Sequence, residues 1–168
     1  MLTIRLRSIV HKWLLTPVGY LLFFIFSGLA AAIAISFDST QLIINGNSYT
    51  LEIAKTSKQR QQGLMFRQQL DRRKGMLFIY PQPGKHRIWM KDTHIPLSVI
   101  WIDENQIVID VQILPPCESD PCQSYGVSKA SKYIIELNSR VRGIGPGDSI
   151  EGLKQFANQE SDRPLPGD

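Results

Sequence analysis

The sequence predicts an α+β domain that is mostly β: a small curled or barrel-like sheet with one or two short helices, preceded by an N-terminal membrane helix. Three observations lead to this fold class. A long apolar run without charges lies at residues 13–35. After it, six or more short stretches show the alternating or compact apolar patterns of β-strands. Only two short stretches carry helix signals, and a curled or closed sheet leaves few strand edges exposed.

The N-terminal segment has the charge distribution of an export signal. The charged side chains ahead of the apolar run, Arg5, Arg7 and Lys12, are all basic. A run of about 20 apolar residues can cross a bilayer as a helix, and basic residues ahead of it stay in the cytoplasm. Residues 13–35 are therefore expected to be a cleaved signal peptide or an uncleaved transmembrane anchor. Either alternative places the domain in the periplasm, released or attached to the inner membrane, with residues 1–12 as a cytoplasmic basic segment.

The remainder of the chain is nearly neutral. Three of the 19 lysines and arginines precede residue 13 and none of the 15 acidic residues does, which leaves 16 basic and 15 acidic side chains. Nucleic-acid binding depends on many phosphate contacts, so no nucleic-acid partner is expected. The expected partners are the membrane, through an uncleaved N-terminal helix, and an envelope ligand or protein.

The chain after residue 35 is expected to hold one folded domain. Residues 36–41 are expected to be a spacer and residues 42–155 a single β-rich domain, long enough for one core. Residues 156–168 have little to bury and are expected to be disordered.

The first elements of the domain have local sequence signals. Residues 42–53 predict a hairpin around Asn45-Gly46, a turn pair that tolerates positive φ. Thr56 and Gln59 have the spacing of a capping box at a helix start. Gly63 is expected to end this short, polar helix.

Further strands are expected from apolar runs and alternation. Prolines after residue 80 are expected to stop the first of them, and a polar turn at residues 103–106 is expected to join two of them in a hairpin with one face in a core. The predicted spans are residues 75–80, 86–91, 97–102, 107–113 and 133–137, with a last short strand at 149–153.

Two turns complete the domain. The only cysteines, Cys117 and Cys122, lie in the Pro-rich stretch PPCESDPCQSYG. In an oxidising compartment they are expected to form a disulfide that fixes the loop, and the alternative is a thiol redox pair, although such pairs are usually C-x-x-C at a helix start. Residues 143–147 predict a glycine-proline turn in which Asp148 binds backbone amides.

Six short motifs, in this order and spacing, resemble a known family. They are GLMFR (63–67), GMLFIY (75–80), WMKDTHIPL (89–97), VIWID (99–103), YIIELN (133–138) and GIGPGD (143–148). The chain is identified by them as similar to the family called domain of unknown function 192, in particular to its exported members with a cysteine loop. The resemblance implies a compact, mostly β fold with a small helix and brings no established activity.

The chain departs from the family pattern at two places. Ser98 stands where the family usually has an aspartate, so a site that needs that carboxylate would be missing. Asn138-Ser139-Arg140 replaces a glycine that usually follows the E-L segment, which argues against this turn as a backbone cradle for a ligand.

The expected function is non-enzymatic binding or assembly with an envelope ligand. Aromatic faces bury area and polar groups orient a ligand, and the residues expected to do so are Arg67, Trp89, Lys91, Asp92 and His94. Trp89 has polar neighbours and is expected to be exposed, whereas Trp101 alternates within an apolar strand. In the purely structural interpretation, Asp92 and Thr93 make turn hydrogen bonds and His94 is solvated.

The alternative function is a small hydrolase-like or soft-metal-handling activity around Arg67, Asp92 and His94. Asp92 and His94 would share a strand face as base and orienting group, with Arg67 as an anion clamp. The sequence has no G-x-S-x-G or H-E-x-x-H motif, and catalysis is the less favoured class. Thioethers and imidazoles suit Cu(I), but methionines more often fill core space. No cofactor and no metal site are therefore expected; the residues weighed as soft ligands are Met65, Met76, Met90, His86 and His94.

Overall fold

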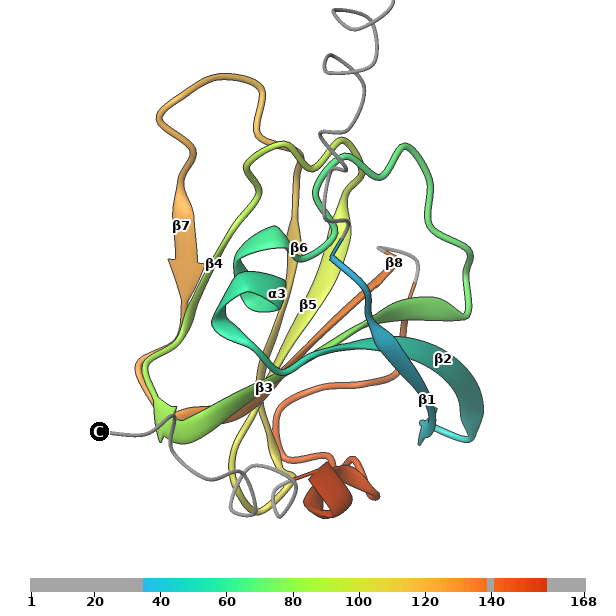
Figure 1. The fold of residues 1–168 in the computed structure, drawn as a ribbon. Helices are drawn as coiled ribbons and strands as arrows, with labels where there is room; N and C mark the ends of the chain where they lie inside the picture. Colours follow the sequence, from blue (N-terminus) through green and yellow to red (C-terminus); the bar gives the residue numbers. More distant parts are fainter. Residues whose placement is uncertain (1–34, 139–140, 157–168) are drawn as a thin grey trace, which may run out of the picture. The chain divides into compact units, whose positions relative to one another are not determined.

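The computed structural model describes residues 35–138 and 141–156, which belong to one compact unit that begins at Ile35 (Figure 1). The predicted signal peptide or membrane helix (13–35) and the predicted tail (156–168) lie outside these residues except for one residue each, and they stay predictions. Within the described ranges, no helix has both the length and the apolar character needed to span a bilayer.

Six strands form the main sheet, in the spatial order β1-β2-β3-β8-β5-β6. Their bounds are β1 (Asp38–Ile44), β2 (Asn47–Ala54), β3 (Lys74–Gly84), β5 (Leu97–Ile102), β6 (Val108–Leu114) and β8 (Ser131–Asn138). β2 and β3 pair in parallel and the other neighbours pair antiparallel. The sheet curls (Figure 1), and in the described part of the chain its edge strands β1 and β6 do not pair with each other. The mostly β, curled-sheet fold is thus confirmed, and closure into a barrel is not observed.

Four smaller elements complete the described part of the fold. β4 (Arg87–Trp89) and β7 (Ser124–Gly126) form a separate antiparallel ribbon. α3 (Ser57–Gln62) follows β2, and the 3₁₀ helix η1 (Leu153–Phe156) lies near the end of the described chain.

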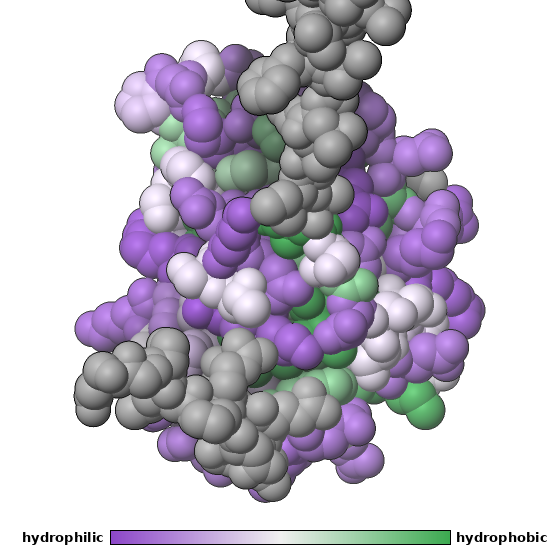
Figure 2. All heavy atoms as spheres, in the orientation of Figure 1, coloured by the Kyte–Doolittle hydropathy of each residue, from purple (hydrophilic) through white to green (hydrophobic). Residues whose placement is uncertain are grey.

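Both faces of the main sheet are buried. The first core lies under the segment that follows β8 and includes η1, and the second core lies under α3, the loop after it and the β4–β7 ribbon. First-core residues include Leu51, Leu77, Ile100, Ile135 and Phe156, and second-core residues include Leu64, Met76, Ile88, Val99, Trp101 and Ile134. On the side of the molecule shown in Figure 2, polar side chains cover most of the surface and apolar ones show only in small areas between them.

The local signals of the sequence are confirmed. Asn45 and Gly46 connect β1 and β2 with φ values of 48° and 71°. The Thr56 side chain accepts the Gln59 backbone N–H while the Gln59 side chain accepts the Thr56 N–H, which is the predicted capping box. Gly63 ends the helix with φ 49°. In the glycine-proline turn, Asp148 Oδ2 accepts the Gly145 N–H at 2.8 Å, as expected.

Several predicted boundaries are wrong. β1 begins at Asp38, inside the expected spacer, because its polar first half pairs with β2. β3 continues through its prolines to Gly84, since its pairing with β8 shifts register between Ile79 and Gly84 and the missing N–H groups do not break a regular ladder. Residues 149–153 form only an isolated bridge at Ser149 before η1, and β7 was not predicted.

The predicted hairpin of β5 and β6 is confirmed, but the expectation that only one of its faces lies in a core is wrong for β5. All six residues of β5 are buried, because β5 lies between β8 and β6 with a core on each face. A strand covered on both faces has a continuous apolar run in place of alternation.

Candidate functional site

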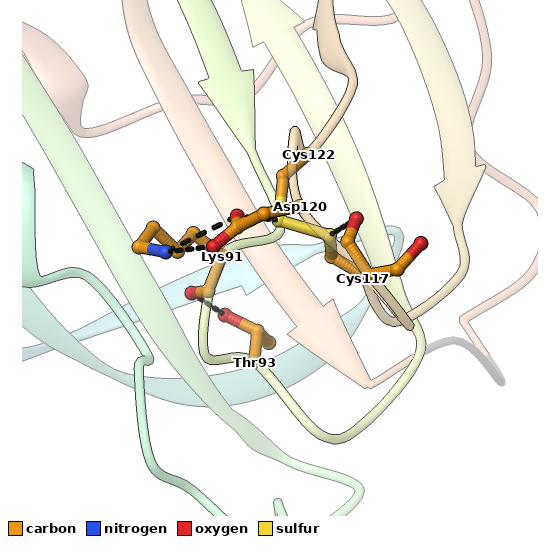
Figure 3. The surroundings of a disulfide bond; sticks show 6 residues. Lys91, Thr93, Cys117, Asp120 and Cys122 are labelled. Carbon is orange, nitrogen blue, oxygen red and sulfur yellow. Dashed lines mark hydrogen bonds and ion pairs between the residues drawn. A yellow bond between two sulfur atoms is a disulfide. The ribbon is translucent and has the colours of Figure 1, made fainter.

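Two loops meet beyond the β4–β7 ribbon. β4 leads directly into the loop of residues 90–96, and the cysteine loop of residues 115–123 leads directly into β7. Because Trp89 pairs with Ser124 in the ribbon, the two loops leave it side by side. The predicted disulfide Cys117–Cys122 is present, with an S–S distance of 2.05 Å (Figure 3), and the Asp120–Pro121 peptide bond is cis.

Hydrogen bonds fix the backbone of the first loop, residues 90–96. The Thr93 side chain is only 5% exposed; its N–H donates to Met90 O at 3.1 Å and its hydroxyl to Lys91 O at 3.3 Å. Asp92 has a φ of 52°, and its carbonyl accepts the Phe66 N–H at 2.7 Å. The structural interpretation is therefore correct for Thr93, and the side chains beside it are oriented by a fixed backbone.

The two loops enclose a small polar recess. Lys91 Nζ bridges to Asp120, at 2.9 Å from Oδ2 and 3.2 Å from Oδ1 (Figure 3). This partner raises the pKa of Lys91 above its ordinary value. The recess has a volume of about 160 Å³ and is lined by Lys91, Asp92, His94, Cys117, Glu118, Ser119, Asp120 and Cys122. We call it the loop recess.

Three of the five predicted ligand-binding residues thus line one recess. Lys91, Asp92 and His94 do so, and Arg67 does not, because its Nη2 donates to Glu52 Oε2 at 2.7 Å. Trp89 is 43% exposed on β4, as expected from its polar neighbours, but it is not among the residues that line the recess. The predicted meeting of Arg67 with Asp92 and His94 is therefore not observed.

Most of the residues considered as soft metal ligands pack against other side chains. Met76 and Met90 are buried in the second core. His86 stacks on Tyr80 with ring centroids 3.5 Å apart, and its Nε2 lies 3.0 Å from Gln82 O. In the part of the chain that the structure describes, no three His, Cys, Asp or Glu side chains are grouped to hold a metal ion.

The sequence prediction missed acidic residues at two places. Glu118 and Asp120 line the loop recess, and their position inside the disulfide loop was the available signal. Glu136 lies in β8 between Met76 and Val99, where burial raises its pKa to about 8. Its signal was a carboxylate within the apolar run YIIEL, in which both faces are covered. Ser98, where the family usually has aspartate, is buried in β5 with a hydroxyl that has no hydrogen-bond partner among the described residues.

The fold and the loop recess define a small, single-domain, β-rich protein with a polar surface site. The model of the family domain of unknown function 192, described as "Uncharacterized ACR", matches residues 40–152. Because this match covers more than half of the chain, the chain belongs to that family, as its motifs indicated.

Two solved structures are similar to this one. The first, described as a "putative transcription regulator" from Sinorhizobium meliloti 1021, is 30% identical with a TM-score of 0.63, and the match covers 71% of this chain and 97% of that one. The second, a protein of unknown function from Novosphingobium aromaticivorans DSM 12444, is 24% identical with a TM-score of 0.60, over 74% of this chain and 91% of that one. The second supports the fold alone. No curated protein matches the chain.

Proposed function

We propose that this chain is a non-enzymatic binding module that acts outside the cytoplasm and holds a cationic group of an envelope peptide or protein in the loop recess. One observation carries this proposal: Lys91, Asp92 and His94 meet the acidic residues of the disulfide loop around one recess. Only Lys91 of these three has a side chain that forms an ion pair with another described residue.

The charge of the loop recess favours a cationic ligand. Asp92, Glu118 and Asp120 supply three carboxylates, and Lys91 offsets the charge of Asp120 through their ion pair. Asp92 and Glu118 form no ion pair with any residue that the structure describes. An ammonium or guanidinium group would meet these two carboxylates as hydrogen-bond acceptors, with the His94 side chain beside them.

The size of the loop recess favours one group of a larger partner. Sites that enclose whole small molecules usually measure about 300–1,000 Å³, well above the 160 Å³ found here. One water occupies about 30 Å³ of liquid, so the loop recess has room for a single side chain. The exposed indole of Trp89, on the strand that leads into the recess, offers a face for further contact with such a partner.

An extracytoplasmic location is part of the proposal. The Cys117–Cys122 disulfide supports it, because such bonds persist in oxidising compartments. The apolar run at residues 13–35 supports export through the membrane. The regulatory role suggested for the Sinorhizobium protein is not extended to this chain, since the loop recess is acidic and the chain after residue 35 has 16 basic and 15 acidic residues, which gives little attraction to DNA.

The test is binding of a lysine pentapeptide to the full-length chain in neutral detergent, followed by Trp fluorescence and calorimetry. We expect binding that is lost when the same peptide has acetylated lysines, because acetylation removes the charge. The double variant Asp92→Asn/Glu118→Gln is expected to weaken binding by about tenfold or more, as charge-assisted hydrogen bonds are lost. Trp89→Ala is expected to abolish the fluorescence change.

The matched control is Glu104→Gln/Glu151→Gln, which removes two exposed carboxylates elsewhere. This variant should bind like the parent. Equal weakening by both double variants, or no binding of the lysine peptide at all, would refute the proposed site.

A further inference from the structure

Three arginines meet at one end of the main sheet. Arg72 and Arg73 directly precede β3, and Arg142 follows β8 by four residues. β3 and β8 are antiparallel neighbours, so the start of one and the end of the other lie at the same end of the sheet. β2 runs parallel to β3 and therefore begins there too, at Asn47.

These arginines line a pocket of about 530 Å³ that has no acidic residue among its described lining residues. Its lining residues are Asn47, Tyr49, Arg72, Arg73, Val141 and Arg142. The nearest acid in the sequence, Asp71, is paired with Lys74 at 2.9 Å. None of the three arginines forms an ion pair with a residue in the described ranges. We call this site the arginine pocket.

The fold holds Arg73 in place. Its backbone carbonyl accepts the Thr50 N–H at 2.9 Å, which ties the residue to β2. Its Nη2 donates to Asn47 Oδ1 at 3.3 Å, and Asn47 Nδ2 in turn donates to Asn45 O at 3.0 Å. Asn47 therefore uses its amide to orient the guanidinium, whose other N–H donors remain for a ligand.

Arg142 is also positioned by its neighbours. Val141 and Ile144 pack against the first core, which fixes the backbone on both sides of Arg142. Gly143 has a φ of 76°, and a Cβ there would lie 2.5 Å from Asn45 Nδ2. The glycine thus lets this segment lie directly on the β1–β2 turn, beside Asn47.

The positive charges of three guanidinium groups around one pocket favour the binding of an anion, because no described acidic residue pairs with them. In a chain with almost equal numbers of basic and acidic residues after residue 35, composition alone does not produce such a cluster. Like charges held close together repel, and a bound anion relieves the repulsion. Guanidinium groups bind phosphate oxygens in a bidentate manner, and the Tyr49 hydroxyl at the pocket wall is an additional donor.

We propose that the arginine pocket binds a phosphate-bearing small molecule, through a phosphomonoester or diphosphate group that carries at least two negative charges. A monoanionic carboxylate would leave two of the three arginines unbalanced. The volume of the pocket exceeds that of a phosphate alone, so a group about the size of a sugar or glycerol fits beside it. This site and the loop recess are lined by different residues and have opposite charge.

The probe is inorganic pyrophosphate, titrated into the full-length chain in neutral detergent at low salt. Binding is expected by calorimetry, together with a rise in melting temperature, since a ligand of the folded state stabilises it. The double variant Arg72→Gln/Arg142→Gln is expected to weaken binding by about tenfold or more. The variant Arg72→Lys/Arg142→Lys keeps the charge but not the bidentate geometry. Its affinity for pyrophosphate is expected to lie between those of the parent and the Arg72→Gln/Arg142→Gln variant.

The matched control is Lys85→Gln/Lys129→Gln, which removes two exposed cations outside the pocket. It should bind pyrophosphate like the parent. No binding by the parent, equal weakening by the control, or tighter binding of a DNA duplex through the same arginines would overturn the proposal. The phosphate group could belong to a lipid headgroup or to a free phosphate ester, and two further ligands distinguish these sources: the soluble lipid dihexanoyl phosphatidic acid and glycerol 3-phosphate. Tighter binding of the lipid assigns the pocket to a lipid headgroup. Equal binding of the two ligands assigns it to a free phosphate ester.

Discussion

The Phe66 backbone N–H donates to the backbone carbonyl of Asp92 at 2.7 Å, and both residues have positive φ values, of 64° and 52°. This bond joins the loop after α3 to the loop after β4. It brings together two family motifs, GLMFR and WMKDTHIPL, through residues that are 26 positions apart in the sequence. The sequence suggested that Arg67 would meet Asp92 with its side chain, but the contact between the two motifs is made by the backbone of the preceding residue.

Asp92 is expected to tolerate substitution only by residues that accept positive φ. Asp92→Val should lower the free energy of unfolding by about 1–2 kcal/mol, because a β-branched side chain is strained in the left-handed region. Asp92→Asn should keep the parent stability. Thermal denaturation of both variants, followed by circular dichroism, checks this. Equal melting temperatures for the two variants would show that the φ of Asp92 is not a constraint.

Gly75 is expected to be irreplaceable at the start of β3. A Cβ there would lie 2.2 Å from Glu136 O and 2.6 Å from a methyl carbon of Leu137, so the backbones of β3 and β8 would have to separate. Gly75→Ala should cost at least about 2 kcal/mol of stability, as in other overpacked cores. Gly145→Ala is the control, since nothing lies within 4 Å of its added Cβ. A melting temperature for Gly75→Ala equal to that of the control would contradict the close approach.

The buried hydroxyl of Ser98 is expected to lower the stability of the folded chain. Its hydroxyl is buried without a partner among the described residues, and a buried unpaired polar group costs about 1–3 kcal/mol. Ser98→Ala should therefore raise the free energy of unfolding, by up to about 1 kcal/mol once the lost packing is counted. Ser131 provides the opposite case, because its equally buried hydroxyl donates to Gly84 O at 3.4 Å. Ser131→Ala should destabilise, and a destabilised Ser98→Ala would mean that its hydroxyl has a partner.

Features set by neighbouring residues in the sequence could be predicted. The Asn45-Gly46 turn, the Thr56–Gln59 capping box and the Cys117–Cys122 bond each depend on residues at most five positions apart. The start of β1 could not be predicted, because its polar residues become strand only by pairing with β2. A short strand such as β7 likewise depends on its partner β4, which is distant in the sequence: Arg87 pairs with Gly126 and Trp89 with Ser124.

The candidate sites show the same difference between features set by residues close in the sequence and features set by distant partners. Lys91, Asp92 and His94 could be chosen as a group because they are close in sequence, and they do share a recess. Their acidic counterpart Asp120, 29 residues from Lys91, could be assigned only once the two loops were seen to meet. The arginine pocket combines residues from three separate strand ends, and no local pattern indicates such a combination.

Glu136 is expected to make the stability of the protein depend on pH. Burial raises the pKa of this carboxyl from 4.5 to about 8, so between these values the folded chain keeps a proton that the unfolded chain releases. The stabilisation is fully present below the unfolded pKa of 4.5 and is lost as the pH rises toward 8. Within that window the free energy of unfolding should fall by about 1.4 kcal/mol per pH unit at most, and the dependence should level off above it.

The variant Glu136→Gln isolates this effect, because glutamine resembles the protonated acid and does not titrate. Its melting temperature should match the parent near pH 5 and exceed it at pH 8, when thermal denaturation is measured across this range. Glu151→Gln, an exposed carboxylate beside η1, should follow the parent at every pH. If Glu136→Gln and the parent differ by the same amount at pH 5 and pH 8, the Glu136 carboxyl does not hold its proton in the folded chain.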